Sequence, residues 1–142
     1  MEIILAENHG FCYGVKRAVE MANEAADSDG KSYTLGPIIH NPQVVGRLES
    51  KGVSPIQEVS DIDEGTMIIR SHGVGPAIYE EAEEKGLNIL DATCPHVKKA
   101  QQDAKSVIED GMTLVILGEK NHPEVKSINL WANKKGIIIE DE

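Results

Sequence analysis

The sequence predicts an α/β protein built of three-layer modules, each with a mostly parallel sheet between helices, because short apolar segments alternate with amphipathic ones. The apolar segments are rich in Ile, Leu and Val and have the length of strands, at 2–6, 32–35, 66–70, 87–91, 112–118 and 136–140. Amphipathic stretches of helical length separate most of them, at 12–27, 42–51, 76–85, 95–109 and 123–132. Alternation of this kind favours parallel strands connected by helices on both faces of the sheet.

Residues typical of helix ends support these boundaries. Four prolines fall in expected first turns, where a missing N–H costs little: Pro42, Pro76, Pro95 and Pro123. Three glycines follow expected last turns: Gly52, Gly86 and Gly111. The segment 53–65 has the weakest pattern, and we interpret it as a short strand followed by an acidic turn.

Composition limits the classes of partner. The 142 residues are 40% hydrophobic and 27% charged, as in soluble globular proteins, and only 4% are aromatic, so the core must be mainly aliphatic. The formal net charge of −10 argues against nucleic-acid binding, which needs clustered Lys and Arg. An anionic ligand would need local donors to hold it against this overall charge.

No segment of the sequence has the pattern of a targeting signal or a membrane span. The N-terminal ten residues carry acids at Glu2 and Glu7, and the longest apolar runs, at 114–117 and 137–139, are only as long as strands. We therefore expect a cytoplasmic protein with no membrane partner. Disulfides are rare in that compartment, so Cys12 and Cys94 are buried thiols, reactive thiols or metal ligands.

The chain contains an internal repeat with an offset of 82 residues. The phrase "CYGVKRA" at 12–18 returns as "CPHVKKA" at 94–100, and His40 falls on His122. We interpret 1–93 as one complete module and 94–142 as the first part of a second pseudo-repeat, without a counterpart of the third strand. An incomplete second sheet would have an open edge and exposed apolar surface, which favours dimerisation or marginal stability.

All histidines and cysteines fall where an expected strand gives way to a helix: His9, Cys12, His40, His72, Cys94, His96 and His122. In a parallel sheet such junctions gather at the carboxyl edge, where ligands bind. Helix N-termini point unpaired N–H groups toward the same space. This edge could therefore hold a phosphate, activate a thiolate or present imidazoles.

One cysteine per module suggests a metal centre between the modules, but two thiolates complete neither a zinc nor an iron–sulfur site. The chain has no C-x₂-C pair, and neither "GVGP" nor "GFCYG" is a nucleotide-binding fingerprint.

Five motifs together carry a family resemblance. "GFCYGVKRAVE", "PIIHNPQVV", "IRSHGVGP", "DATCPHVKKAQ" and "NHPEV" occur in the order, and near the spacings, of the LytB-type iron–sulfur family of 4-hydroxy-3-methylbut-2-enyl diphosphate reductases. The resemblance covers essentially the whole chain but only about the first half of the usual family length.

The resemblance implies an oxidoreductase of the non-mevalonate isoprenoid pathway. Family members are three-part α/β proteins around a 4Fe-4S cluster, with one cysteine from each part, and they reductively remove the hydroxyl of an allylic diphosphate. It implies that Cys12 and Cys94 are cluster ligands and that Glu124 lies on the proton-delivery path. It further implies that three histidines line the substrate pocket: His40, His72 and His122. His9 and His96 receive no role, and the implied electron donor is a reduced ferredoxin or flavodoxin.

The chain departs from the family pattern because it has no third cysteine. We therefore expect weak cluster binding and little or no turnover from this polypeptide alone. Two other hypotheses remain open: an anion- or metal-binding module without redox activity, and a zinc hydrolase that uses Cys12, Cys94, a histidine and Glu124.

Overall fold

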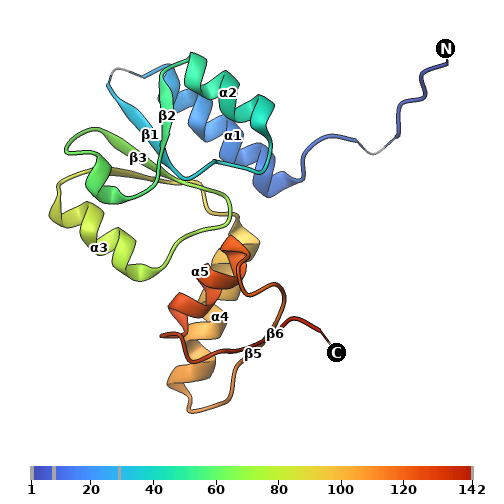
Figure 1. Cartoon of the computed structure of the whole chain (residues 1–142), viewed down its shortest axis with the longest axis vertical. Helices are drawn as coiled ribbons and strands as arrows, with labels where there is room; N and C mark the ends of the chain where they lie inside the picture. Colours follow the sequence, from blue (N-terminus) through green and yellow to red (C-terminus); the bar gives the residue numbers. More distant parts are fainter. Residues whose placement is uncertain (1, 8, 29, 142) are drawn as a thin grey trace.

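The computed structural model describes residues 2–7, 9–28 and 30–141, and they form two parallel sheets (Figure 1). The first sheet has four parallel strands in the order β2-β1-β3-β4. Their bounds are β1 Ser32–Leu35, β2 Val53–Ile56, β3 Thr66–Ile69 and β4 Asn88–Asp91. Each of these parallel strands is followed by a helical segment, so the loops after the strands gather at one common edge, where the carboxyl ends of the strands lie.

Helices cover both faces of this first sheet. On one face lie α1 (Tyr13–Ala26) and α2 (Pro42–Ser50), whose alanines and aliphatic residues pack on strand residues such as Ile68. On the other face lie α3 (Pro76–Glu84) and the short 3₁₀ helix η1 (Val59–Asp61), packed on Met67 and Ile69. The alternation of side chains along β3 therefore supplies two separate aliphatic cores, one on each face of the sheet.

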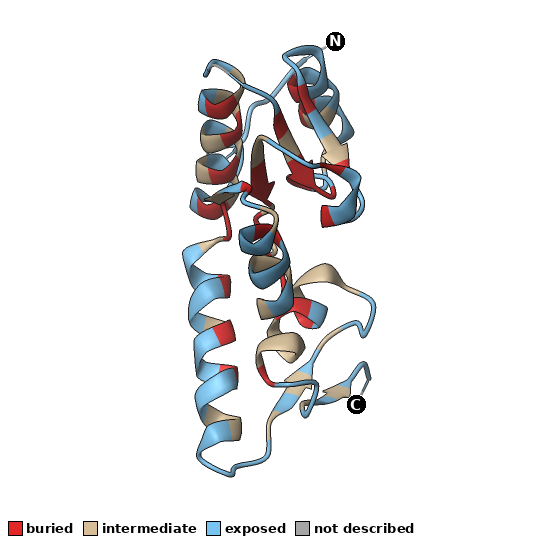
Figure 2. Ribbon diagram, turned by 90° about the vertical axis from the view of Figure 1, so that its left-hand side faces the viewer, coloured by how far each residue is buried: buried red, intermediate tan, exposed pale blue. Residues whose placement is uncertain are grey.

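The second unit is smaller and covered on one face only. It consists of α4 (Pro95–Glu109), β5 (Val115–Leu117), α5 (Pro123–Trp131) and β6 (Ile137–Ile139), with β5 parallel to β6. The half-buried Ile116 and Ile138 alternate with four exposed residues of the opposite face: Val115, Leu117, Ile137 and Ile139. Figure 2 shows that buried residues concentrate in the first unit, whereas much of the second unit is exposed.

The predicted α/β class with a mostly parallel sheet is confirmed, and every predicted helix is present within two residues of its expected ends. The weakly patterned segment 53–65 forms β2 and η1. The predicted strand at 2–6 is wrong: residues 2–7 form no strand, and Ile4 is 82% exposed. A strand is stable only when a neighbour accepts its backbone hydrogen bonds, and this segment extends away from both sheets (Figure 1).

No helix in the described part of the chain is both long and apolar enough to cross a membrane.

Candidate functional site

Three histidines from three different loops meet at the carboxyl edge of the sheets. His40 follows β1, His72 follows β3 and His122 follows β5. The ring centroid of His72 lies 4.5 Å from that of His40 and 5.7 Å from that of His122, and His40 and His122 are 6.0 Å apart. One side-chain nitrogen from each ring lies within 4.8 Å of the other two. The cluster joins the two units, because His122 belongs to the second unit, in the loop between β5 and α5.

His72 is partly buried and has an unsatisfied polar atom. Its Nδ1 atom is buried and has no hydrogen-bond partner among the described residues. Burial is the main cause that lowers the pKa of His72 to about 4, and the charges of the neighbouring His40, Arg70 and His122 contribute to the same shift. The ring is therefore neutral near pH 7, and its buried polar atom is available to a ligand.

His122 has a defined tautomer because it caps a helix. It is the N-cap of α5, and its Nδ1 accepts a hydrogen bond of 3.2 Å from the Glu124 N–H. In the neutral ring the proton must then lie on Nε2, which makes this atom a donor. A donor suits an anionic oxygen better than a metal ion, which needs the free lone pair of the nitrogen.

A second helix also begins at the site. His40 directly precedes Asn41, the N-cap of α2, whose Oδ1 accepts 3.1 Å hydrogen bonds from Gln43 N–H and Val44 N–H. The N-terminal ends of α2 and α5 therefore both lie beside the imidazoles. Each end contributes partial positive charge, which favours an anion although the chain as a whole is acidic.

Hydrogen bonds connect the loops that carry these side chains. Ser71 donates to the Ile38 carbonyl through both its N–H and its Oγ, each at 3.3 Å. The Cys94 N–H in turn donates to the Ser71 carbonyl at 2.9 Å. Cys94 is thus fixed next to His72, and the thiol and the imidazole belong to one edge.

The two cysteines hold equivalent positions, each as the N-cap of a helix: Cys12 at α1 and Cys94 at α4. Both are free thiols, with Cys12 exposed and Cys94 partly buried. The sulfur of Cys94 lies against Gly14, so close that a Cβ at Gly14 would overlap it. Cys94 therefore packs against the first turn of α1, two residues after Cys12.

Arg17 secures the strand end that leads to Cys94. Its guanidinium donates to the Thr93 carbonyl at 3.2 Å and to the Asp91 carbonyl at 3.4 Å. Arg17 of the phrase "CYGVKRA", which begins with Cys12, thus holds the loop that precedes Cys94. The two halves of the repeat are connected by this contact across the sheet edge.

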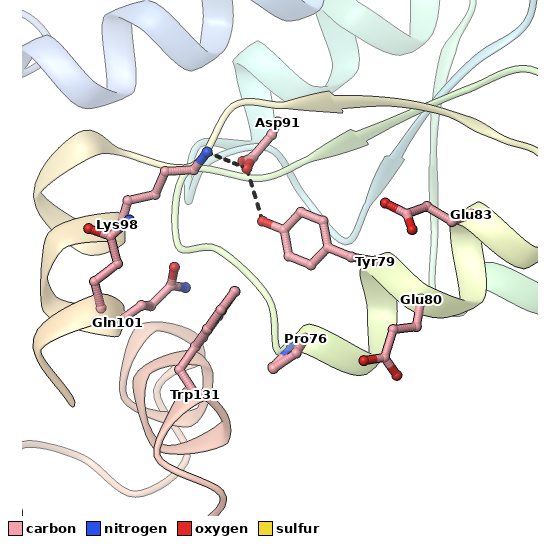
Figure 3. A pocket seen from close by; sticks show the side chains of 9 residues that line it. Pro76, Tyr79, Glu80, Glu83, Asp91, Lys98, Gln101 and Trp131 are labelled. Carbon is pink, nitrogen blue, oxygen red and sulfur yellow. Dashed lines mark hydrogen bonds and ion pairs between the residues drawn. The ribbon is translucent and has the colours of Figure 1, made fainter. Parts of the chain in front are cut away.

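Asp91 is the centre of a polar network on the other side of this loop (Figure 3). Lys98 forms a 2.6 Å ion pair with it, Tyr79 donates to it at 2.9 Å, and Thr93 N–H also donates at 2.9 Å. Burial alone would raise the pKa of Asp91, but these donors outweigh burial and the pKa lies below its ordinary value. The network lines a cavity of about 390 Å³ closed on one side by Trp131. Both carboxylate oxygens of Asp91 therefore already accept hydrogen bonds from the protein itself.

The structure places the predicted site residues as follows. His40, His72 and His122 lie together, and Cys94 and Cys12 lie at neighbouring helix starts of the same edge. Glu124 is in the first turn of α5, beside His122. His96 is exposed, and His9 bonds only to the Ala6 carbonyl within the exposed N-terminal segment. His9 therefore does not lie at a strand-to-helix junction, because the strand expected before it is absent.

Sequence reasoning missed Arg17, Asn41 and Arg70 as residues of this region. Asn41 followed by Pro42 is a common N-cap signal that could have placed the helix end at the site. Arg70 directly precedes Ser71 and His72, so the sequence alone indicates that Arg70 lies near His72. The sequence does not indicate which side chains surround Arg70 in the folded chain.

The molecule is thus an α/β protein with an imidazole cluster, and with two cysteines at helix N-cap positions, at the carboxyl edge of its parallel sheets. Comparison with known proteins makes this class more specific. The chain belongs to the LytB family, since the family model described as "LytB protein" matches residues 3–142.

Relatives of the chain carry one name. It is 53% identical over 139 residues to the 4-hydroxy-3-methylbut-2-enyl diphosphate reductase of Geotalea uraniireducens, covering 98% of this chain and 49% of the relative. It is 51% identical over 142 residues to that of Geobacter metallireducens, covering 100% of this chain and 50% of the relative. The chain therefore spans about half the length of the curated relatives it matches.

Solved structures give the same result. A structure of (E)-4-hydroxy-3-methyl-but-2-enyl diphosphate reductase matches 98% of this chain and 51% of its own with a TM-score of 0.84 and 49% identity. The reductase structure from Plasmodium falciparum matches 95% of this chain and 43% of its own with a TM-score of 0.91 and 33% identity.

Proposed function

We propose that this chain is the diphosphate-binding part of a reductase that converts 4-hydroxy-3-methylbut-2-enyl diphosphate to isopentenyl and dimethylallyl diphosphates. The names of the relatives support the reaction class. The observation that carries the proposal for this chain is the cluster of His40, His72 and His122, drawn from three loops beside two helix N-termini. Imidazole donors and helix ends can neutralise a diphosphate without a strongly basic surface.

The histidines would act as donors to the diphosphate oxygens. His122 presents an Nε2 proton because its Nδ1 is occupied by the Glu124 N–H. His72 is neutral in the free site at neutral pH, and the negative charge of a bound anion would raise its pKa from about 4. Binding at a pH between the free and the bound pKa of His72 would therefore be accompanied by proton uptake.

Glu124 is proposed to deliver the proton that the reaction needs at oxygen. In the overall conversion the C–O bond breaks, the hydroxyl takes up a proton and leaves as water, and the allylic fragment takes up two electrons and a second proton at carbon. Glu124 lies in the first turn of α5, next to the histidine that binds the anion. That position is compatible with a general acid close to the leaving hydroxyl.

The donor set of the chain fits two positions of a 4Fe-4S cluster. Cys12 and Cys94 are free thiols at neighbouring helix N-termini, and such ends stabilise the negative charge of a thiolate ligand. When bound, the cluster would supply electrons and a Lewis-acidic iron for the hydroxyl. Cys12 and Cys94 are the only cysteines of the 142 residues. We therefore propose that this chain alone holds a cluster weakly and turns over little or not at all, and that a ferredoxin or flavodoxin is the electron donor of the whole enzyme.

A metal-binding module without redox activity is a second candidate, since the three histidine nitrogens lie close enough to share one ion. The tautomer of His122 favours the anion instead. A metal ion that took Nε2 of His122 would require the proton to leave this ring or the Glu124 N–H bond to break.

Calorimetric titration with inorganic pyrophosphate tests the diphosphate role. His40→Asn and His122→Asn should each weaken binding by about tenfold or more, because each removes an imidazole donor. Asn is a good N-cap residue, so the second variant keeps the start of α5. The matched control is His96→Asn at an exposed position, which should bind as the unchanged chain does. Equal affinities for all four proteins would refute the proposal.

Anaerobic incubation with iron and sulfide tests the cluster proposal separately. We expect little stable absorbance in the visible range from the 142-residue chain, because two thiolates leave a cluster underligated. A stable brown product that requires Cys12 and Cys94 would contradict the predicted weak binding.

A further inference from the structure

A second cavity lies between the two units, and none of the three clustered histidines lines it. It has a volume of about 330 Å³ and is bounded by the Gly36-Pro37 turn, by Arg70, by the loop 73–75 and by the first turns of α5. Its polar lining includes Arg70, Lys126, Ser127 and Gln57, and no Asp or Glu lines it. The cavity is thus lined by two positively charged side chains and by no carboxylate. This local positive charge contrasts with the whole chain, which has 24 acidic and 14 basic residues.

Arg70 has no partner of its own. Its Nε atom is buried without a hydrogen-bond partner among the described residues, and within the same residues the guanidinium forms neither a hydrogen bond nor an ion pair. Burial lowers the pKa of the Arg70 guanidinium, although arginine stays charged in proteins. Partial burial of a charge is costly unless a counter-charge or hydrogen bonds compensate it. Arg70 is therefore a group that lacks its ligand.

The backbone around Arg70 is shaped to expose it to the cavity. Gly36 has a φ of +70°, and a Cβ there would lie 2.7 Å from Nη1 of Arg70. A side chain at this position would push the guanidinium away, so glycine allows the charged group to lie against the turn. Lys126 approaches from α5 and is not ion-paired among the described residues.

Two helix ends add to the positive field. Gly75 is the N-cap of α3 and Pro123 is the first residue of α5, and both line the cavity. The N-terminal end of a helix carries partial positive charge and favours anions. The two side-chain cations and the two helix ends therefore all favour a ligand of the same sign.

We infer that this cavity is a binding site for a phosphate-type oxyanion, held by Arg70 and Lys126 and separate from the histidine cluster. The planar guanidinium donates to oxygens in pairs, and a doubly charged anion satisfies two cations at once. A carboxylate offers only one charge and is the weaker match. The inference does not depend on the reaction proposed above, because it uses none of the histidines or cysteines, although the N-terminal end of α5 lies beside both sites.

Nuclear magnetic resonance of the ¹⁵N-labelled full chain tests the site with inorganic phosphate as the probe, at constant ionic strength. The Nε–H signal of Arg70 should shift and saturate together with the amides of Gly73 and Gly75. Arg70→Gln and Lys126→Gln should each weaken this saturation by about tenfold or more, since each removes one charge-assisted contact. Arg70→Lys keeps the positive charge but loses the planar guanidinium, which donates paired hydrogen bonds. If Arg70→Gln does not fold, intermediate phosphate binding by Arg70→Lys supports the guanidinium contact.

Three controls make the result decisive. Arg47→Gln removes an exposed arginine of α2 and should leave the phosphate response unchanged. His40→Asn should also leave it unchanged even if it weakens pyrophosphate binding at the histidines, which separates this site from the proposed function. An Arg70 Nε–H signal that phosphate does not move, or an equal saturable response to acetate, would overturn the assignment.

Discussion

His72 has a buried, unpaired Nδ1 and two imidazole neighbours, and its pKa of about 4 lies below the ordinary value of 6.5. Between these two values the unfolded chain binds a proton at this residue and the folded chain does not. Folding stability should therefore decrease as pH falls from 6.5 toward about 4, and the loss attributable to His72 should end below that range.

Thermal unfolding as a function of pH checks this prediction. His72→Asn should lower the dependence of the unfolding temperature on pH in that range, because the residue no longer titrates. His96→Asn, at an exposed position, is the control. A pH dependence equally steep in the unchanged chain and in His72→Asn would show that His72 is not the titrating group.

Gly14 is predicted to hold the sulfur of Cys94 in place by lacking a side chain. Gly14→Ala should displace the sulfur, so Cys94 should react several-fold faster with a thiol reagent. The helix itself should tolerate the change, because alanine favours helix by about 0.5–1 kcal/mol over glycine. Gly46→Ala is the matched control: Gly46 lies in α2 with open space at its Cβ, and this variant should be stabilised with unchanged thiol reactivity. Unchanged reactivity of Cys94 in Gly14→Ala would contradict the assigned contact.

At the scale of single residues, the sequence identifies the chemical groups but not their partners. His40, His72 and His122 were predictable because each follows a strand, and parallel strands end at one edge. The unpaired state of Arg70 was not predictable, because it depends on which side chains fail to reach it in three dimensions. The short distance between Gly14 and Cys94 depends in the same way on how the first turn of α1 lies against the residue that precedes α4.

At the scale of elements, the connection between the units depends on the network around Asp91 (Figure 3). Tyr79 of α3 and Lys98 of α4 both bind this residue of β4. Burial, followed by the negative charge of Asp91, raises the pKa of Tyr79, so its hydroxyl stays a donor at physiological pH. Loss of the hydroxyl would leave a half-buried carboxylate with one donor fewer.

Tyr79→Phe should therefore lower the free energy of unfolding by about 1.5–3 kcal/mol, as expected for a hydrogen bond to a charged group. Tyr33→Phe is the matched control. Tyr33 is also half-buried in the core on that face, but among the described residues it makes no side-chain hydrogen bond, so this change should cost less than about 0.5 kcal/mol. Denaturant unfolding measures both, and equal effects would show that the hydroxyl of Tyr79 contributes nothing.

The exposed face of β5 and β6 is the second feature at this scale. Leu117 is 75% exposed and lies beside Ile139 in the strand pairing. Parallel strands are normally covered on both faces, so we predict that this exposed apolar face mediates self-association of the chain.

Leu117→Lys should shift the chain toward monomer, because a charge in an apolar contact is costly. Sedimentation velocity over a range of protein concentrations measures the change. Met112→Lys, an equally radical change at an exposed position before β5, should have less effect. Identical association of the unchanged chain and Leu117→Lys would exclude this face as the contact.

Five helices and five strands were predictable from periodicity and helix-end residues, since these signals are local. The strand predicted at 2–6 is absent because strand formation is not a local property. The segment has the apolar composition of a strand, but a strand also needs a neighbouring strand, which periodicity does not reveal. Val53–Ile56 was uncertain because Pro55 interrupts its pattern, yet as an edge strand it can lose one donor.

At the scale of the whole molecule, the repeat places equivalent residues at equivalent places in two sheets. His40 precedes α2 and His122 caps α5, while Cys12 and Cys94 cap α1 and α4. The sequence offset predicted this equivalence, but only the packing of the two units brings His122 to the other two histidines. The site exists because the second unit is docked on the first.

The central claim is that His40, His72 and His122 form a single anion site across the two units. The most direct test is to follow the imidazole signals of all five histidines by nuclear magnetic resonance during titration with inorganic pyrophosphate. If the three imidazoles bind one anion, their signals should shift along one binding curve and the pKa of His72 should rise from about 4, while His9 and His96 should not respond. Independent curves for the three rings, or equal responses from His9 and His96, would contradict it.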